Sequence, residues 1–185
     1  FSLVVKAPYL RKSYQSKKDV SSILFESLPE TAVLALASIV IASVLGILLG
    51  VLSALYQDQW IDKTLLLLAT SGMALPSFFV GIIFAWLFGY VWSDWTGLNM
   101  SGSLYEVDDL GRGEYVNWSN LVLPALTLGI RPLSVVLQLS RNSMLEVLSM
   151  DYVRTARAKG LTTRSTLFNH ALKNALNPVV TTISG

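Results

Sequence analysis

The sequence predicts an all-α membrane protein, a polytopic bundle of transmembrane helices. Of its 185 residues, 52% are hydrophobic and only 14% are charged, and the mean hydropathy is +0.53. Soluble domains carry about 25% charged residues. The charges gather in short segments, and the uncharged runs between them reach the length of about 20 residues that crosses a bilayer. A net charge of +2 does not suggest nucleic acid as a partner, and the absence of cysteine excludes disulfide and thiolate chemistry.

The first uncharged run, 31–57, predicts the first membrane span. The segment before it, 1–29, is expected outside the bilayer, with a short interfacial helix over 20–28 that ends at Pro29. Small residues recur at every fourth position of the run, and they predict a face on which another helix can pack closely. These residues are Ala42, Gly46, Gly50 and Ala54.

The second uncharged run, 64–93, is longer than a span needs, so we expect a tilted or kinked helix. Pro76 is the predicted position of the kink, because proline removes a helical hydrogen bond. Aromatic residues gather toward the end of the run, as is typical of a membrane–water interface. They are Trp86, Tyr90, Trp92 and Trp95.

An acidic loop, 94–119, follows the second run. Asp108, Asp109 and Glu114 could be read as a calcium cluster or as parts of a solvated loop. Their spacing is not that of a known calcium-binding loop, which favours the solvated loop. No metal site is therefore predicted.

The third span, 120–140, contains a charge, Arg131, followed by Pro132. A charged side chain this deep in a span usually faces the interior of the bundle or water. Arg131 could line a pathway and meet a carboxylate. The more usual alternative is that it pairs with a neighbouring helix or extends to an interface. The segment 141–150 continues the helix, and a fourth span is expected to start at 178.

The segment 151–178 is polar and basic although apolar runs flank it, and it reads as two short helices. Asp151 can cap the first helix, Gly160 can end it, and Pro178 is expected to close the second. Such a unit outside the bilayer fits a docking element. It fits equally well a basic loop held near anionic lipids.

Two stretches of this unit, DYVRTARAKGL at 151–161 and HALKNALNP at 170–178, resemble the cytoplasmic loop of ABC-importer permeases. The resemblance is closest to the oligopeptide/dipeptide/nickel branch of the type I importers. The broad family carries Glu-Ala-Ala where this chain has Arg154, Thr155 and Ala156, so a salt bridge of that glutamate is not carried over. Gly160 stands at the motif glycine.

A second match lies in the N-terminal part of the chain. The peptide-permease family carries a Ser-Tyr and then a Leu-Pro-x-Thr before its second membrane helix. This chain has the corresponding residues Ser13, Tyr14, Leu28, Pro29 and Thr31. The resemblance therefore extends over nearly the whole chain and implies a type I ABC importer permease fold without the family's first and last spans.

The resemblance also implies a site and partners. It places 30–185 in a multi-pass permease domain of the cell inner membrane, with 141–177 as the cytoplasmic loop that couples to the ATPase. The residues expected at the coupling site are Arg154, Thr155, Ala156, Arg157, Lys159, Gly160 and Leu161. The implied partners are the lipid bilayer, a second permease subunit, two ATP-binding-cassette ATPase subunits and an extracytoplasmic substrate-binding protein.

No catalytic site or cofactor is expected in this chain. It has a single histidine, His170, and no GxxxxGK[ST] phosphate-binding motif. ATP hydrolysis would therefore belong to a separate subunit. The alternatives are an ion-coupled secondary transporter and a membrane scaffold that transports nothing. Lysine and arginine number six on the side of the N-terminus and seven on the side of 151–178, which leans only slightly toward a cytoplasmic 151–178.

Overall fold

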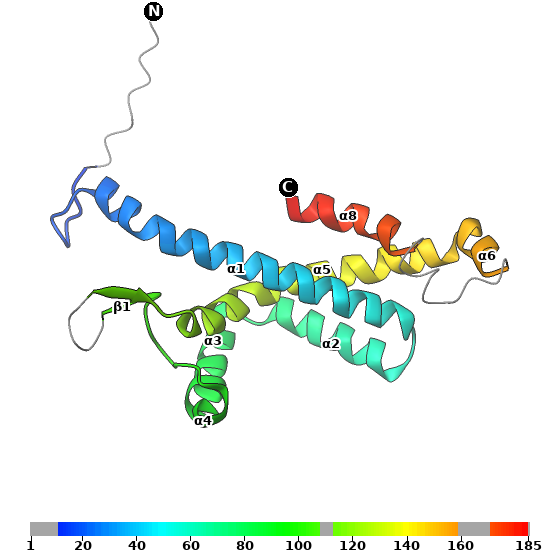
Figure 1. The fold of residues 1–185 in the computed structure, drawn as a ribbon, viewed down its shortest axis with the longest axis horizontal. Coiled ribbons are helices and arrows are strands. Elements are labelled where there is room, and N and C mark those ends of the chain that lie inside the picture. Colours follow the sequence, from blue (N-terminus) through cyan, green and yellow to red (C-terminus); the bar gives the residue numbers. More distant parts are fainter. Residues whose placement is uncertain (1–10, 108–112, 159–170, 185) are drawn as a thin grey trace, which may run out of the picture.

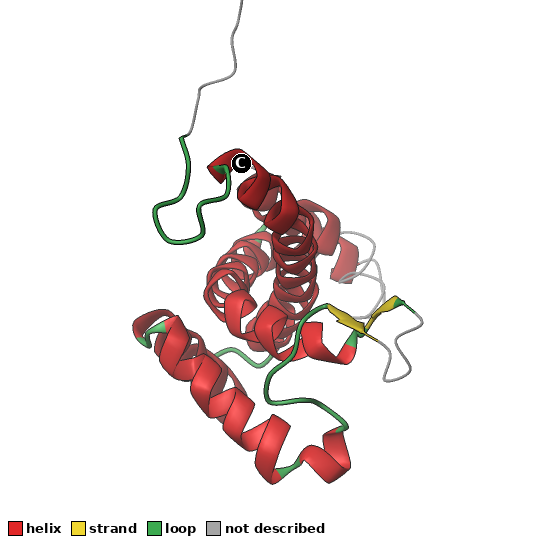
Figure 2. Ribbon diagram, turned by 90° about the vertical axis from the view of Figure 1, so that its left-hand side faces the viewer, coloured by secondary structure: helices red, strands yellow, loops and turns green. Residues whose placement is uncertain are grey.

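The computed structural model describes residues 11–107, 113–158 and 171–184. The described elements are α1 (Val20–Leu55), α2 (Trp60–Ala74), α3 (Ser77–Trp86), the π-helix η1 (Leu87–Val91), α4 (Ser93–Thr96), β1 (Tyr105–Val107), β2 (Glu114–Val116), α5 (Ser119–Ser149), α6 (Asp151–Ala158) and α8 (Leu172–Ser184). The long helices α1 and α5 run in the same direction, and α2 and α8 return alongside them (Figure 1). Figure 2 looks at the bundle from the end that carries the antiparallel pair β1–β2.

The pairing of α1 with α5 forms the centre of the bundle. The predicted small-residue face is confirmed, because Ala42, Gly46, Gly50 and Ala54 are all buried. A Cβ added to Gly50 would lie 2.6 Å from the Leu137 carbonyl oxygen, so the two backbones meet at a distance that only glycine permits. Close van der Waals packing of this kind is what holds helices together in lipid.

Two predicted helix ends are wrong, and both had been placed at prolines. Pro29 lies inside α1, which begins at Val20 and continues through it, so the expected interfacial helix is the first part of the long helix. Pro178 lies inside α8, which spans Leu172–Ser184. Both prolines are exposed. The carbonyl groups that proline leaves without a helical partner can therefore bind solvent or headgroups instead.

The second uncharged run is divided at Pro76, as the sequence predicts for a kink. Leu75 is extended there (ψ 139°), and the helices on either side are bent by 113°. The run is therefore two helices followed by η1, and the expectation of one kinked helix over 64–93 is corrected. α3, η1 and α4 turn away from the bundle axis (Figures 1 and 2).

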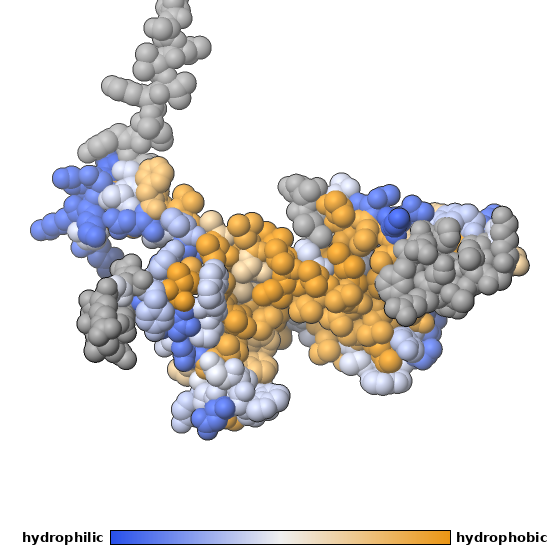
Figure 3. Space-filling view, in the orientation of Figure 1, coloured by the Kyte–Doolittle hydropathy of each residue, from blue (hydrophilic) through white to orange (hydrophobic). Residues whose placement is uncertain are grey.

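The third span extends beyond its predicted end, because α5 continues without a break from Ser119 to Ser149. By length and composition, α1 and α5 can each cross a membrane, and α2 with α3 would form a third span if the bent pair is one span. The surface is apolar around the middle of the bundle and hydrophilic toward both ends (Figure 3). The helical membrane-protein class predicted from composition is confirmed.

The contact of α1 with α5 yields a first prediction. Gly50→Leu should lower the free energy of unfolding by about 1–3 kcal/mol, because the new side chain meets backbone that cannot yield without separating the helices. The measurement is the thermal midpoint of the purified protein in detergent. Leu48→Val, at a position that is 61% exposed, is the matched control. Equal midpoints for the two variants would contradict the close contact.

Candidate functional site

Two polar regions lie at opposite ends of the bundle. The segment before α1 and the β1–β2 pair lie at one end, and the α1–α2 turn lies with α6 at the other (Figure 1). The expected coupling loop and the acidic loop are thus separated by the length of the helices. The candidate coupling site is built around α6.

α6 is joined to α5 by a single residue. Met150 adopts an extended conformation (ψ 148°) and separates the last residue of α5 from Asp151, which begins α6. The Val153 amide donates to the Met150 carbonyl (3.1 Å), and the Thr155 hydroxyl donates to the Asp151 carbonyl (2.9 Å). One extended residue and two local hydrogen bonds thus fix where α6 begins relative to the end of α5.

The inner face of α6 is anchored in a buried apolar cluster. Val153 has no exposed surface and packs among side chains of three other helices. Its buried neighbours in the cluster are Ala54, Met144, Val147, Ala171 and Ala175. The cluster therefore joins the ends of α1 and α5 to the residues at the start of α8 and fixes the position of α6.

A hydrogen bond also connects α6 to α8. The Asn174 side-chain amide donates to the Tyr152 hydroxyl at 2.9 Å. Tyr152 is 39% exposed, so this bond lies at the edge of the buried cluster. α6 thus contacts both α5 and α8.

The predicted coupling residues fall into two groups. Arg154, Thr155, Ala156 and Arg157 lie on α6, where Thr155 is exposed. Lys159, Gly160 and Leu161 lie outside the described residues, as do His170 and the predicted end of the first helix at Gly160.

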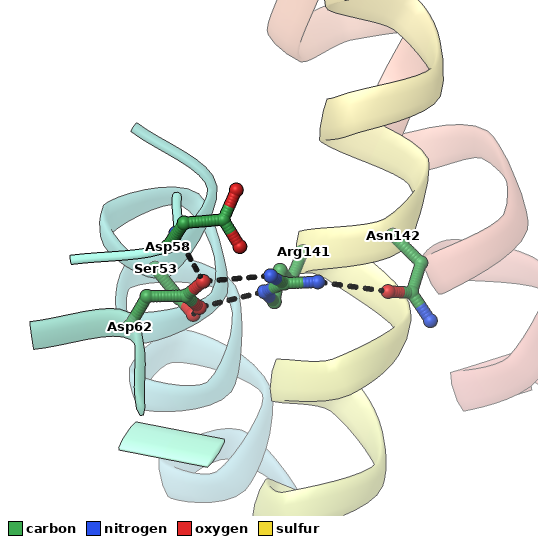
Figure 4. Close-up of polar contacts among 5 residues, drawn as sticks. All are labelled: Ser53, Asp58, Asp62, Arg141 and Asn142. Carbon is green, nitrogen blue, oxygen red and sulfur yellow. Dashed lines mark hydrogen bonds and ion pairs between the residues drawn. The ribbon is translucent and has the colours of Figure 1, made fainter. Parts of the chain in front are cut away.

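An ion pair lies at the same end as α6. Arg141 on α5 donates to both carboxylate oxygens of Asp62 on α2, from Nε to Oδ1 and from Nη2 to Oδ2, each at 2.7 Å (Figure 4). The Ser53 hydroxyl of α1 donates to Oδ1 at 2.5 Å. The Asp58 amide of the α1–α2 turn donates to Oδ2 at 2.9 Å. One carboxylate thereby connects α1, the turn, α2 and α5.

Both side chains of this ion pair are largely buried. Asp62 is 2% exposed and Arg141 is 14% exposed. Removing two charges from water is expensive, and it is offset only when the geometry is good and the remaining lone pairs are satisfied. The bidentate arginine and the two further donors meet that condition.

The sequence analysis did not find this ion pair. Asp62 falls between the first two predicted spans, and Arg141 falls in the predicted helical continuation after the third span. A usable signal was present in the sequence. Asp62 precedes the second uncharged run and Arg141 follows the third span, so both are expected on the same side of the bilayer. Sequence alone does not say that the two charges face each other.

Arg131 lies on the exposed side of α5. Within the described part of the chain, its side chain makes no hydrogen bond or ion pair. Pairing with a neighbouring helix of this chain, the more usual interpretation, is therefore not observed among the described residues.

The opposite end of the bundle carries a polar network centred on Glu106. Its Oε2 accepts hydrogen bonds from the side chains of Asn117 and Tyr115, each at 2.9 Å. Its Oε1 accepts from Asn120 at 2.6 Å. These bonds, from Asn117 first and then Asn120 and Tyr115, hold the pKa of Glu106 below its ordinary value. The network ties the β1–β2 pair to the first turn of α5.

Nothing in the described part of the chain supports the calcium interpretation of the acidic loop. Among those residues, no group of three His, Asp or Glu side chains could hold a metal ion. Asp108 and Asp109 lie outside the described residues, and Glu114 lies on β2.

The described helices that are long and apolar enough to cross a membrane define the class, a helical membrane protein. Residues 46–184 match the family described as the binding-protein-dependent transport system inner membrane component, and the chain belongs to this family. The family resemblance predicted from 151–178 is confirmed.

Three relatives illustrate the similarity. The chain is 37% identical over 167 residues to the di/tripeptide transport system permease protein DppB of Pseudomonas aeruginosa, covering 83% of this chain and 49% of that protein. It is 38% identical over 169 residues to the dipeptide transport system permease protein DppB of Escherichia coli, covering 83% of this chain and 50% of that protein. It is 35% identical over 187 residues to the dipeptide transport system permease protein DppB of Haemophilus influenzae, and this match covers 92% of this chain and 55% of that protein. The chain thus spans about half the length of these relatives.

The ion pair yields a second prediction. Asp62→Asn should destabilise the protein by about 3–5 kcal/mol, because it leaves the Arg141 guanidinium largely buried without its counter-ion. Asp62→Asn combined with Arg141→Gln should recover part of that loss. The measurement is a double-mutant cycle on the unfolding midpoint in detergent. Strictly additive losses would contradict the coupling of the two side chains.

The Glu106 network yields a prediction on pH. Because the folded-state pKa lies below the unfolded value, its stabilisation is fully present above the unfolded pKa and is lost as the pH falls through the folded-state pKa. Acidification should therefore reduce the protection of the Asn117 amide, which donates to the Leu104 carbonyl at 2.8 Å. Hydrogen exchange, measured relative to an unstructured peptide at each pH, is the test. Glu106→Gln is the control, and an equal pH response in this variant would contradict the assignment.

Proposed function

We propose that the chain is part of a permease subunit of an ATP-driven, peptide-type importer, multi-pass in the cell inner membrane. The observation that carries the proposal is the placement of α6. It lies at one end of the bundle, with its inner residue Val153 buried and Thr155 and Ala158 exposed. Short exposed helices held rigidly to a membrane bundle suit contact with a soluble subunit. The similarity to dipeptide permeases supports this choice of function.

In this proposal α6 faces the cytoplasm and, with the residues up to Leu161, contacts an ATP-binding-cassette ATPase subunit. Two such subunits, a second permease and an extracytoplasmic substrate-binding protein complete the assembly. Hydrolysis of ATP takes place on the ATPase subunits. The residues assigned to the contact are Arg154, Thr155, Ala156, Arg157, Lys159, Gly160 and Leu161.

The contacts of α6 suggest how movement reaches the spans. When the ATPase subunits close, α6 is displaced, and α5 follows because a single residue links the two helices. α8 follows through the buried cluster and the bond of Asn174 to Tyr152. The ion pair of Asp62 with Arg141 carries the α1–α2 turn along with α5. Such rigid-body movement of packed helices is the basis of alternating access.

A cysteine crosslink tests this function, since the chain contains no cysteine of its own. Ala158→Cys, at an exposed position of α6, should crosslink in native membranes to a protein identified by mass spectrometry as an ATP-binding-cassette subunit. Ser101→Cys, exposed at the opposite end of the bundle, is the matched control and should give no such product.

The alternative functions predict other outcomes. A secondary transporter would give uptake that persists without any ATPase subunit, and a scaffold would give no accumulation of substrate. Labelling of Ala158→Cys by an impermeant thiol reagent added outside intact cells, without a crosslink, would reverse the proposed orientation.

A further inference from the structure

The helices α3, η1 and α4, which we call the arm, leave the bundle at a sharp bend (Figures 1 and 2). Leu75 and Pro76 are both extended (ψ 139° and 133°), and the helices on either side of them are bent by 113°. The ring centroid of Phe88 lies 5.5 Å from those of Phe84 and Trp92, and this aromatic stack stiffens the arm along its length. The arm is therefore a stiff piece that is joined to α2 through two extended residues.

The arm packs against α5 near its start. Val80 is 6% exposed, and a Cβ on Gly81 would lie 3.2 Å from the Thr127 methyl group of α5. None of the residues of η1 and α4, both of which the structure describes in full, is buried. Tyr90 and Trp95 are 68% and 86% exposed. Burial of side chains therefore does not hold the far part of the arm in place.

A short segment connects the end of the arm to the bundle. We call residues 99–103 the strap, and it leads from the arm into β1. On one side the strap touches the arm, because a Cβ on Gly89 would lie 2.6 Å from the Met100 Cα. On the other side it lies on α5, because a Cβ on Gly102 would overlap the Asn120 side-chain amide. Glycine permits the close approach at both places.

Asn120, in the first turn of α5, fastens the strap. Its Nδ2 donates to the Ser103 carbonyl at 2.9 Å and to Oε1 of Glu106 at 2.6 Å. Its Oδ1 accepts from Nδ2 of Asn99 at 2.8 Å. Both N–H groups and the oxygen of this amide are thus engaged, and the residue is 7% exposed. One side chain therefore holds both ends of the strap to α5.

The strap forms one wall of a cavity of about 410 Å³ at the end of the bundle that carries β1–β2. Phe78 and Gly81 of the arm line a second side, and Leu34 of α1 and Thr127 of α5 line the rest. The cavity thus lies between the two attachments of the arm, its packing at Gly81 and the strap on Asn120. A tilt of the arm about its start widens this cavity and requires the strap to leave Asn120.

We propose that the strap and Asn120 form a latch that keeps the arm against α5 and the cavity closed. When its hydrogen bonds break, the arm tilts about its start and the cavity opens at the β1–β2 end. Hinged movement needs a few residues that absorb the change in backbone angles, and the extended Leu75 and Pro76 supply them. All residues of the strap are exposed, so water can replace the broken hydrogen bonds. This movement is additional to that of α6.

The accessibility of a cysteine in the cavity tests the latch, since the chain has no cysteine of its own. Thr127→Cys, at a half-buried position, reports on the cavity. A water-soluble methanethiosulfonate should modify it about tenfold faster, or more, when Asn120→Ala is added, because the hydrogen bonds of the strap are lost. The full-length protein in lipid nanodiscs is used, and the readout does not depend on transport. Asn142→Ala, the same substitution at an exposed position of α5, is the matched control and should leave the rate unchanged.

Two further variants separate the latch from a general loss of structure. Asn99→Ala removes one hydrogen bond at an exposed position and should raise the rate by a smaller factor, so the latch is tested even where Asn120→Ala does not fold. Ser140→Cys, 2% exposed between α1 and α5, should stay unmodified. An unchanged rate at Thr127→Cys in every variant that folds would overturn the proposal. An equal rise at Ser140→Cys would overturn it too, because Asn120 would then support the whole bundle.

The position of the arm is measured with two spin labels. They are attached at Trp95 of α4 and Val40 of α1, which are 86% and 59% exposed. The distance between the labels should have one narrow distribution while the latch is intact and a broader, longer one with Asn120→Ala or Asn99→Ala. Asn142→Ala should keep the narrow distribution. The same narrow distribution in the latch variants would overturn the proposal, because the arm would then keep its place without the latch.

Discussion

The close approach of α1 and α5 is the constraint on which the rest of the structure depends. Lipid tails solvate leucine as well as another helix does, so membrane helices associate through packing rather than through the hydrophobic effect. At Gly46 and Gly50 the two backbones approach so closely that a Cβ would lie within 3 Å of atoms of α5. The helices α2, α6 and α8 take their places around this pair. α2 and α8 pack against α5, and α6 is seated where α1 and α5 end.

The charged side chains on the helices differ in burial and in pairing. Asp62 and Arg141 are paired and largely buried, and the hydrogen bonds of Asp62 join α1, α2, α5 and the α1–α2 turn, so they hold one end of the bundle together. Arg131, ten residues earlier on the same helix, is exposed. A paired charge stabilises an arrangement of helices, whereas a charge turned outward at mid-membrane must be satisfied by water, a ligand or another subunit.

The same end of the bundle combines an exposed helix with firm attachments. α6 is connected to α5 by one residue, to α8 by the Tyr152–Asn174 bond and to the bundle by the buried Val153. The ion pair lies close to these contacts along the bundle, between α2 and α5. In the proposed function α6 receives movement from another subunit and passes it to several spans, and this role needs firm attachment, because a loosely tethered helix would move without moving the spans.

The sequence by itself determined the membrane class, the small-residue face of α1, the break at Pro76 and the family, because hydropathy, residue size and local motif are properties of neighbouring residues. It misplaced two helix ends at Pro29 and Pro178, since the cost of a proline depends on whether its freed carbonyl reaches solvent. Only the tertiary structure decided that Asp62 meets Arg141 and that Val153 is the buried anchor of α6. Each depends on which helices become neighbours, and residues 79 positions apart in the chain meet only after the spans have packed.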